Sequence, residues 1–149
     1  MKNIDIINLA NTGVLAITAN DLDAAQAYKV LKFKKAVRKA FEVIVESERD
    51  ILKEAGIEDG QAFDKERKEL MESKSDLERL EELNKKFERF MELRNNLYQE
   101  EVELECTVMP FEQFHILQKE NKDVQGKPLN VFEDVLEGVL WEEKEESDK

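Results

Sequence analysis

Glu112 and His115 stand at a spacing that could hold a metal ion. They lie three residues apart in a predicted helix, which places a carboxylate and an imidazole on one face, as in di-iron carboxylate bundles. Such sites need two of these pairs, and His115 is the single histidine of the chain. We therefore expect no metal site and no cofactor, and interpret the pair as a surface glutamate beside a half-buried histidine.

Cys106, the single cysteine, is the second candidate for chemistry. It falls on the apolar side of an alternating segment, where a free cysteine behaves as a small buried hydrophobic residue. A nucleophile needs a base and an orienting group, and His115 is the one base the chain offers. The sequence also lacks a glycine-rich phosphate loop and a Gly-x-Ser-x-Gly elbow. These observations predict that the protein is not an enzyme.

A run of cations without an intervening acid is unusual in a chain with 35 acidic and 23 basic residues and a formal charge of −12. The run consists of Lys29, Lys32, Lys34, Lys35, Arg38 and Lys39. Two interpretations are open. The cations form a solvated face whose long stems shield apolar residues, or they form a docking patch for an acidic surface or for phosphate groups.

Two long helices are predicted to carry these residues. No glycine or proline interrupts residues 21–55, where apolar residues recur at steps of three and four, and Thr18 with Asp21 fits a capping box. A second helix is predicted over residues 64–101 after the stop signal at Gly56. The short connection makes the helices antiparallel neighbours, with the aromatic residues of 28–41 level with those of 87–98.

The far end of this hairpin, residues 46–82, is highly charged. It holds fourteen acidic and seven basic residues but one aromatic, Phe63. Two interpretations are again open: the pair of helices supports itself through ion pairs four residues apart, or it is ordered by docking on a partner. Leu70, Leu77 and Leu80 then form either the seam between the helices or part of an interface.

The terminal segments are expected to pack on the base of the hairpin. Residues 3–18 suit either strands or a helix, residues 102–108 alternate like a half-buried strand, and Pro110 and Asn130 open two short helices. The predicted fold is mainly α. It becomes α+β if residues 102–108 join an N-terminal strand in a small antiparallel sheet, and is otherwise a helical bundle with an extended connector. We expect one domain over residues 1–149, with the hairpin at about 21–101, the C-terminal strand and helices at 102–141, and a fraying acidic tail at 142–149.

Composition indicates where the protein is located and which classes of partner it is expected to lack. No stretch approaches 18 uninterrupted apolar residues, and the N-terminus lacks the order of a signal peptide, so we expect a cytoplasmic protein. The charge of −12 argues against a general affinity for nucleic acid or for anionic membranes.

The order of these features resembles a group of small phage- or prophage-encoded helical-hairpin proteins from the late structural gene region. The similarity lies in Ala24 to Lys32 leading a lysine-rich helix, in Glu48 to Gly56, and in Glu101 to Leu104 entering an extended segment. The resemblance implies a phage or prophage origin, a role in assembly, and a place in the host cytoplasm or in the virion. It supplies no active-site residues.

Two functional hypotheses follow from the sequence. The first is a non-enzymatic interaction or assembly protein that binds a protein partner or itself as a homo-oligomer. The alternative is an acidic mimic of nucleic acid that inhibits a host DNA-binding enzyme. Such a mimic needs uninterrupted rows of acids, whereas seven basic residues interrupt residues 46–82.

Overall fold

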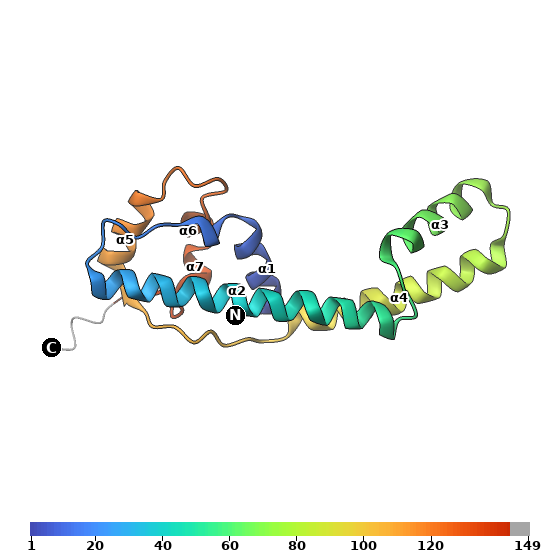
Figure 1. The fold of residues 1–149 in the computed structure, drawn as a ribbon, viewed down its shortest axis with the longest axis horizontal. Coiled ribbons are helices and arrows are strands. Elements are labelled where there is room, and N and C mark those ends of the chain that lie inside the picture. The colour runs from blue at the N-terminus through green and yellow to red at the C-terminus, as the bar shows by residue number, and fades with distance from the viewer. Residues whose placement is uncertain (144–149) are drawn as a thin grey trace. The chain divides into compact units, whose positions relative to one another are not determined.

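The computed structural model describes residues 1–143, which are mainly helical, as predicted (Figure 1). They form two compact units: unit 1 is Met1–Glu42 together with the described residues from Glu101 on, and unit 2 is Val43–Glu100. The elements are α1 (Asn3–Asn11), the 3-10 helix η1 (Val14–Ala16), α2 (Ala24–Glu54), α3 (Gly60–Ser73), α4 (Leu77–Gln99), β1 (Met109–Pro110), α5 (Phe111–Glu120), α6 (Pro128–Val131), α7 (Glu133–Leu136) and β2 (Trp141–Glu142).

Unit 1 buries one stripe of α2 against the two ends of the chain. The α1 helix and the segment from α5 to α7 lie on the same side of α2 (Figure 1). Trp141 packs at the centre of the C-terminal part, with its ring centroid 4.9 Å from that of Phe111 and 5.7 Å from that of Phe114. The buried apolar residues of unit 1 include Ile6, Leu9, Val14, Ile17, Val30, Phe33, Val37, Phe114, Leu117, Leu129, Leu136 and Leu140.

Two glycine turns meet in unit 1 and hold its loops together. Gly13 and Gly126 have φ values of 89° and 84°, in the left-handed region that favours glycine. A Cβ atom on Gly126 would lie 3.0 Å from the carbonyl oxygen of Thr12, and one on Gly13 would lie 3.1 Å from that of Gln125. The two backbones therefore approach closely because neither residue has a side chain.

The start of α2 differs from the predicted capping box. Asp23 accepts a hydrogen bond from the backbone N–H of Gln26 at 3.0 Å, so the helix begins at Ala24 rather than at Asp21. Thr18 instead donates its hydroxyl to the Glu120 carboxylate at 2.6 Å. Glu120, which takes the Thr18 hydroxyl in place of a cap, lies about a hundred residues away in the sequence. The local pattern could therefore not reveal this contact.

Of the two alternatives for residues 102–108, the extended connector is the one observed, and the antiparallel sheet does not form. Residues 3–11 form a helix, so residues 102–108 find no strand to pair with, although their exposed and half-buried side chains alternate as expected. The N-terminal contact is a single antiparallel bridge between Lys2 and Glu101. The described sheet is parallel and has two short strands, with Met109 opposite Trp141 and Pro110 opposite Glu142.

The predicted last helix is also interrupted. Asn130 lies inside α6 instead of capping a helix, and α6 and α7 are separate four-residue pieces joined at Phe132. Glu142 of the predicted acidic tail belongs to β2, and the rest of that tail from residue 144 on lies outside the described residues.

In unit 2, two helices replace the single predicted helix over residues 64–101. The chain breaks between α3 and α4, where Lys74 adopts a left-handed φ of 53°. Asp59 caps α3 through the backbone N–H groups of Gln61 and Ala62, and Asp76 caps α4 through that of Arg79. Ser75 and Asp76 lie inside the single predicted helix, but their short polar side chains favour a turn and a new cap.

Unit 2 has an apolar cluster of its own. Ala55, Ile57, Phe63 and Leu83 are buried together, and Leu52, Leu70, Phe87 and Phe90 pack around them. This cluster corrects the expectation of one aromatic base, because Tyr98 donates to Glu48 of α2 at 2.5 Å rather than lying level with the start of the helix.

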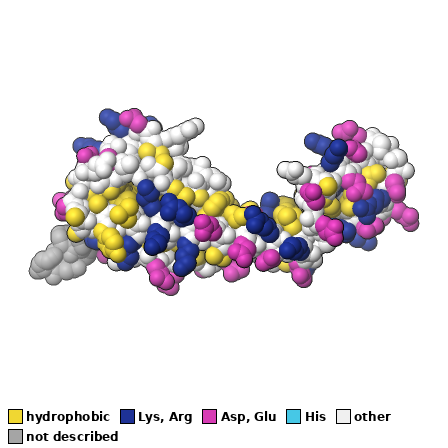
Figure 2. All heavy atoms as spheres, viewed as in Figure 1, with side chains coloured by type: hydrophobic (Ala, Val, Ile, Leu, Met, Phe, Trp, Pro, Cys, Tyr) yellow, Lys and Arg dark blue, Asp and Glu magenta, His cyan; other side chains and the backbone are white. Residues whose placement is uncertain are grey.

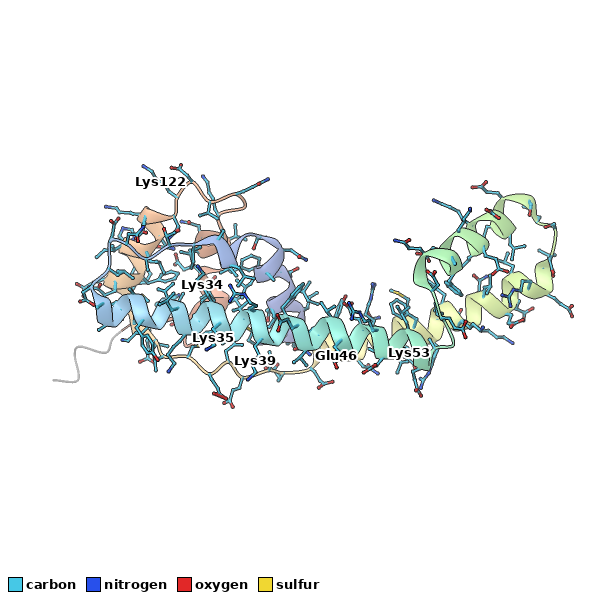
Figure 3. The ribbon with its side chains drawn as sticks, in the orientation of Figure 1. Lys34, Lys35, Lys39, Glu46, Lys53 and Lys122 are labelled. Carbon is cyan, nitrogen blue, oxygen red and sulfur yellow. The ribbon has the colours of Figure 1, made fainter. Side chains whose placement is uncertain are left out.

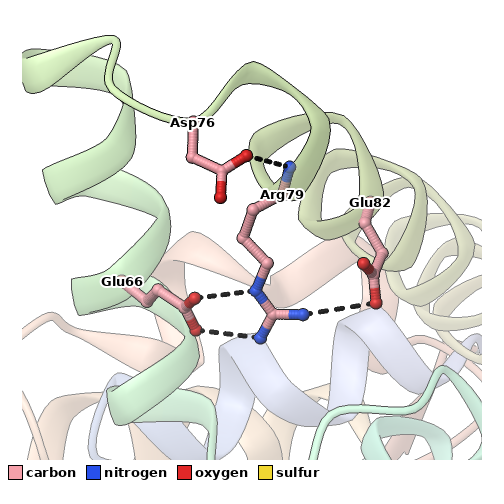
Figure 4. Close-up of polar contacts among 4 residues, drawn as sticks. All are labelled: Glu66, Asp76, Arg79 and Glu82. Atoms are coloured by element: carbon pink, nitrogen blue, oxygen red, sulfur yellow. Dashed lines mark hydrogen bonds and ion pairs between the residues drawn. The ribbon is translucent and has the colours of Figure 1, made fainter.

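One arginine joins α3 to α4 through ion pairs. The Arg79 guanidinium holds the Glu66 carboxylate with two hydrogen bonds of 2.8 and 3.2 Å, and a third bond reaches Glu82 at 3.2 Å (Figure 4). The hydrogen bond from Arg79 lowers the pKa of Glu66 and outweighs the opposing effect of burial.

Candidate interaction surface on α2

The six cations predicted from the sequence do not share one environment. Lys34 lies on the side of α2 opposite to Lys35 and Lys39 (Figure 3). Lys29, Lys32 and Lys34 are half-buried, whereas Lys35, Arg38 and Lys39 are exposed. Three of the six therefore point to solvent, and the other three take part in packing.

Lys34 serves the fold. Its ammonium group donates a hydrogen bond of 2.7 Å to the carbonyl oxygen of Ile17, which ends the 3-10 helix η1. Burial lowers the pKa of Lys34, and the neighbouring Arg38 guanidinium lowers it further. This lysine ties the N-terminal loop to α2 and is not available to a partner.

Lys32 lies between an aromatic ring and the extended segment before β1. Its ammonium nitrogen is 6.0 Å from the centroid of the Tyr28 ring, the outer limit of a cation–π contact. Burial raises the pKa of the nearby Cys106 thiol, and the charge of Lys32 opposes that rise. Cys106 itself donates to the carbonyl oxygen of Val139 at 3.1 Å.

The exposed cations continue a stripe that begins with two apolar residues. Tyr28 is 62% exposed and Leu31 is 61% exposed, and Lys35, Arg38 and Lys39 follow them. At about 100° per residue these five positions cover one face of α2, opposite to the buried face of Val30, Phe33 and Val37. We call Tyr28, Leu31, Lys35, Arg38 and Lys39 the α2 face. Lys and Arg side chains gather over this part of α2 beside apolar ones (Figure 2).

Tyr28 and Leu31 are not among the interaction residues predicted from the sequence, where the aromatic residues of this helix are placed in the apolar base of the hairpin. The helical period of about 3.6 residues could have revealed that both residues are exposed. Tyr28 stands two residues before Val30, and Leu31 stands two before Phe33, so each is turned by about 200° from a buried position. Two large apolar residues placed opposite a complete apolar stripe indicate a contact surface rather than a core.

The three predicted leucines belong to unit 2 and have different surroundings. Leu70 packs against the apolar cluster of unit 2, and Leu80 is half-buried. Leu77, in the first turn of α4, is 66% exposed. Leu70 is therefore part of the seam between the helices, and Leu77 is the member of the three that faces solvent.

His115, a candidate for chemistry, contacts other residues of α5. His115 Nδ1 lies 3.4 Å from Gln118 Oε1, and the imidazole stacks on Phe111 with a centroid distance of 6.1 Å. Within residues 1–143, no three His, Cys, Asp or Glu side chains are grouped as a metal site would require. None of the described helices is both long and apolar enough to cross a bilayer.

Comparison with protein-family models, with curated proteins and with solved structures finds no match to this chain. The geometry therefore carries the functional argument. The α2 face has the chemistry to bind a partner. Its three cationic side chains can donate hydrogen bonds to carboxylates, and its two apolar side chains can be buried beside them.

Proposed function

We propose that this protein is a non-enzymatic interaction protein, and that it associates with a second copy of itself through the α2 face. The observation that carries the proposal is the pairing of two exposed apolar side chains with three exposed cations on one side of a helix whose opposite side is buried. Interfaces are commonly built from an aromatic or apolar anchor and arginine, with charges at the rim.

The proposed contact on the second copy is an acidic surface. Residues 46–82 hold twice as many acidic as basic residues, fourteen against seven, and this is the charge that the α2 face complements. Complementary charge accelerates encounter and fixes the register of an interface. Leu31 and Tyr28 then supply the burial of apolar area that exposed ion pairs cannot provide.

The biological setting that we propose is assembly of a phage or prophage particle, in the host cytoplasm or in the virion. The support is the resemblance carried by Ala24 to Lys32, Glu48 to Gly56 and Glu101 to Leu104. The exposed part of the first segment, Tyr28 and Leu31, belongs to the α2 face. A role in self-association would give these two residues of the pattern a function.

The alternative, an acidic mimic of nucleic acid, receives less support from the contacts of unit 2. Acidic and basic side chains alternate over its surface in Figure 2. Several acids there are engaged with cations, namely Glu66 and Glu82 with Arg79, Glu81 with Lys85, and Glu92 with Arg89. A mimic of the duplex must present unpaired charges about as closely spaced as the phosphates.

Light scattering at two salt concentrations tests the proposal. At 50 mM salt we expect a mass above the 17.4 kDa of one chain, and at 1 M salt, where charges are screened beyond about 3 Å, a shift toward that mass. Reversal of the three exposed cations, by Lys35→Glu, Arg38→Glu and Lys39→Glu together, should give a monomer at both concentrations.

The matched control reverses Lys53, Lys65 and Lys68, which are exposed residues of unit 2, to glutamate. This control changes the net charge by as much as the triple variant of the α2 face does. It adds negative charge to the acidic surface, so the association should persist or strengthen. A monomeric wild-type protein at low salt, or an equal loss of mass in both triple variants, would show that the α2 face is not a self-association surface.

A further inference from the structure

A shallow hollow opens in unit 1 where the end of α5 meets the loop that leads into α6. Its volume is about 200 Å³, room for roughly six or seven water molecules at about 30 Å³ each. Its lining residues are His115, Gln118, Lys119, Lys122, Lys127 and Asn130. Four of the six are basic residues and none of the six is acidic, and the side chains of His115, Asn130 and the three lysines can donate hydrogen bonds.

Three elements place the cations around the hollow. His115, Gln118 and Lys119 occupy one face of the last turns of α5, because they stand three and four residues apart. Lys122 lies on the loop after α5 (Figure 3). Lys127 immediately precedes α6 and adopts a left-handed φ of 43°, a conformation that costs a non-glycine residue on the order of 1 kcal/mol. The preceding residue, Gly126, approaches Thr12 so closely that an added Cβ atom would lie 3.0 Å from the Thr12 carbonyl oxygen.

The floor of the hollow is fixed, while its cations are not engaged elsewhere. The buried Gln118 amide donates to the carbonyl oxygen of Leu129 at 3.1 Å and to the Glu133 carboxylate at 2.8 Å. Within residues 1–143, Lys119, Lys122 and Lys127 form no ion pair. Three exposed lysines thus line one concave surface of an acidic protein.

We infer that this hollow binds a small phosphate-bearing anion. The three lysines supply charge, and Asn130 and the imidazole of His115 supply directed donors, the combination that phosphate recognition uses. No acidic residue belongs to the lining. Glu133 accepts from Gln118 of the floor, Glu120 is held by the loop at Thr18, and Asp123 follows Lys122 in the chain. The inference is independent of self-association, since it uses none of the residues of the α2 face.

Titration followed by backbone amide chemical shifts tests the inference. The probes are inorganic phosphate and pyrophosphate, each added to the full-length protein against sodium chloride at matched ionic strength. We expect saturable shifts confined to residues 115–130, with half-saturation at or below about 1 mM for pyrophosphate and weaker binding of phosphate. Shifts that grow linearly, or that match those caused by chloride, would overturn the inference.

A pair of double variants assigns the effect to the hollow. Lys122→Gln with Lys127→Asn should raise the half-saturating concentration about tenfold or more, because hydrogen bonds to charged groups are lost. Asparagine tolerates the left-handed backbone at residue 127. The control, Lys68→Gln with Lys74→Asn, removes the same charge and includes the other left-handed lysine, at φ 53°. An equal loss of affinity in both variants would contradict a site at the hollow.

Discussion

Glu120 illustrates how a charged side chain in this protein serves folding rather than recognition. Its carboxylate accepts hydrogen bonds from the Thr18 hydroxyl at 2.6 Å and from the backbone N–H groups of Asn20 and Asp21 at 2.7 and 2.8 Å. The adjacent Asn121 bonds both the N–H and the carbonyl oxygen of Thr18, each at 2.8 Å. Two neighbouring residues at the end of α5 therefore hold the loop that leads into α2.

Glu120→Gln should destabilise unit 1 in a pH-dependent way. Burial would raise the pKa of Glu120, but the hydrogen bonds from Thr18, Asp21 and Asn20 outweigh it and hold the pKa below the usual value of 4.5. A carboxyl group with a lowered pKa stabilises the fold above its unfolded pKa, and that contribution is lost as pH falls through the folded pKa.

Urea unfolding of the wild-type protein and of Glu120→Gln at several pH values measures this effect. At pH 7 we expect the variant to lose about 1 kcal/mol of unfolding free energy, a value reduced for the partial exposure of the group. Below the folded pKa the two proteins should converge. A difference that is constant from pH 7 to pH 3 would rule out this role for the carboxylate.

Among the elements, the two glycine turns determine how the loops of unit 1 approach one another. Gly126 needs both a positive φ and the space that a Cβ atom would occupy, 3.0 Å from the carbonyl oxygen of Thr12. Gly138 has a similar φ of 80° but nothing within 4 Å of its virtual Cβ. Comparing Gly126 with Gly138 therefore separates the cost of the left-handed backbone from the cost of placing a Cβ atom against Thr12.

Gly126→Ala should therefore cost more stability than Gly138→Ala. The left-handed backbone alone costs about 1–2 kcal/mol, which is the effect we expect at Gly138. At Gly126 the contact with a backbone atom adds to it, so we expect a total of about 2–4 kcal/mol. Thermal unfolding of the two variants measures the difference. Equal melting temperatures would show that the loops at Gly126 and Thr12 can move apart without loss of stability.

Helices were the part of the fold that the sequence predicted well, because they depend on local periods. The buried face of α2, with Val30, Phe33 and Val37, follows from spacing alone. The break before α4 was missed since Ser75 and Asp76 look like ordinary surface residues until Asp76 is seen to cap a new helix. The sheet partner of Met109 was missed because strand pairing across about thirty residues leaves no local pattern.

The candidate site was predicted in part. The run of cations from Lys29 to Lys39 was found from composition, but burial divides it, and Lys34 proves to be a structural residue. Tyr28 and Leu31 could have been found by projecting the helix instead of counting aromatics. The hollow at Lys122 and Lys127 could not have been found, because it depends on how the loop after α5 packs against Thr12.

For the whole molecule, the charge of −12 is the sum of surfaces with different signs rather than a uniform property. The α2 face exposes three cations beside two apolar side chains, and residues 46–82 carry an excess of acids. A chain with both surfaces can bind a copy of itself without a further partner. We therefore propose one specific contact: the α2 face of one copy touches another copy.

Photo-crosslinking from a single position tests that claim most directly. A benzophenone amino acid replaces Leu31, which is 61% exposed on the α2 face, or Val131, which is 65% exposed on α6. We predict a crosslinked dimer from position 31, with crosslinked peptides from residues 46–82, and little or none from position 131. If no dimer forms from position 31, or if both positions give the same yield of dimer, the α2 face does not contact a second copy.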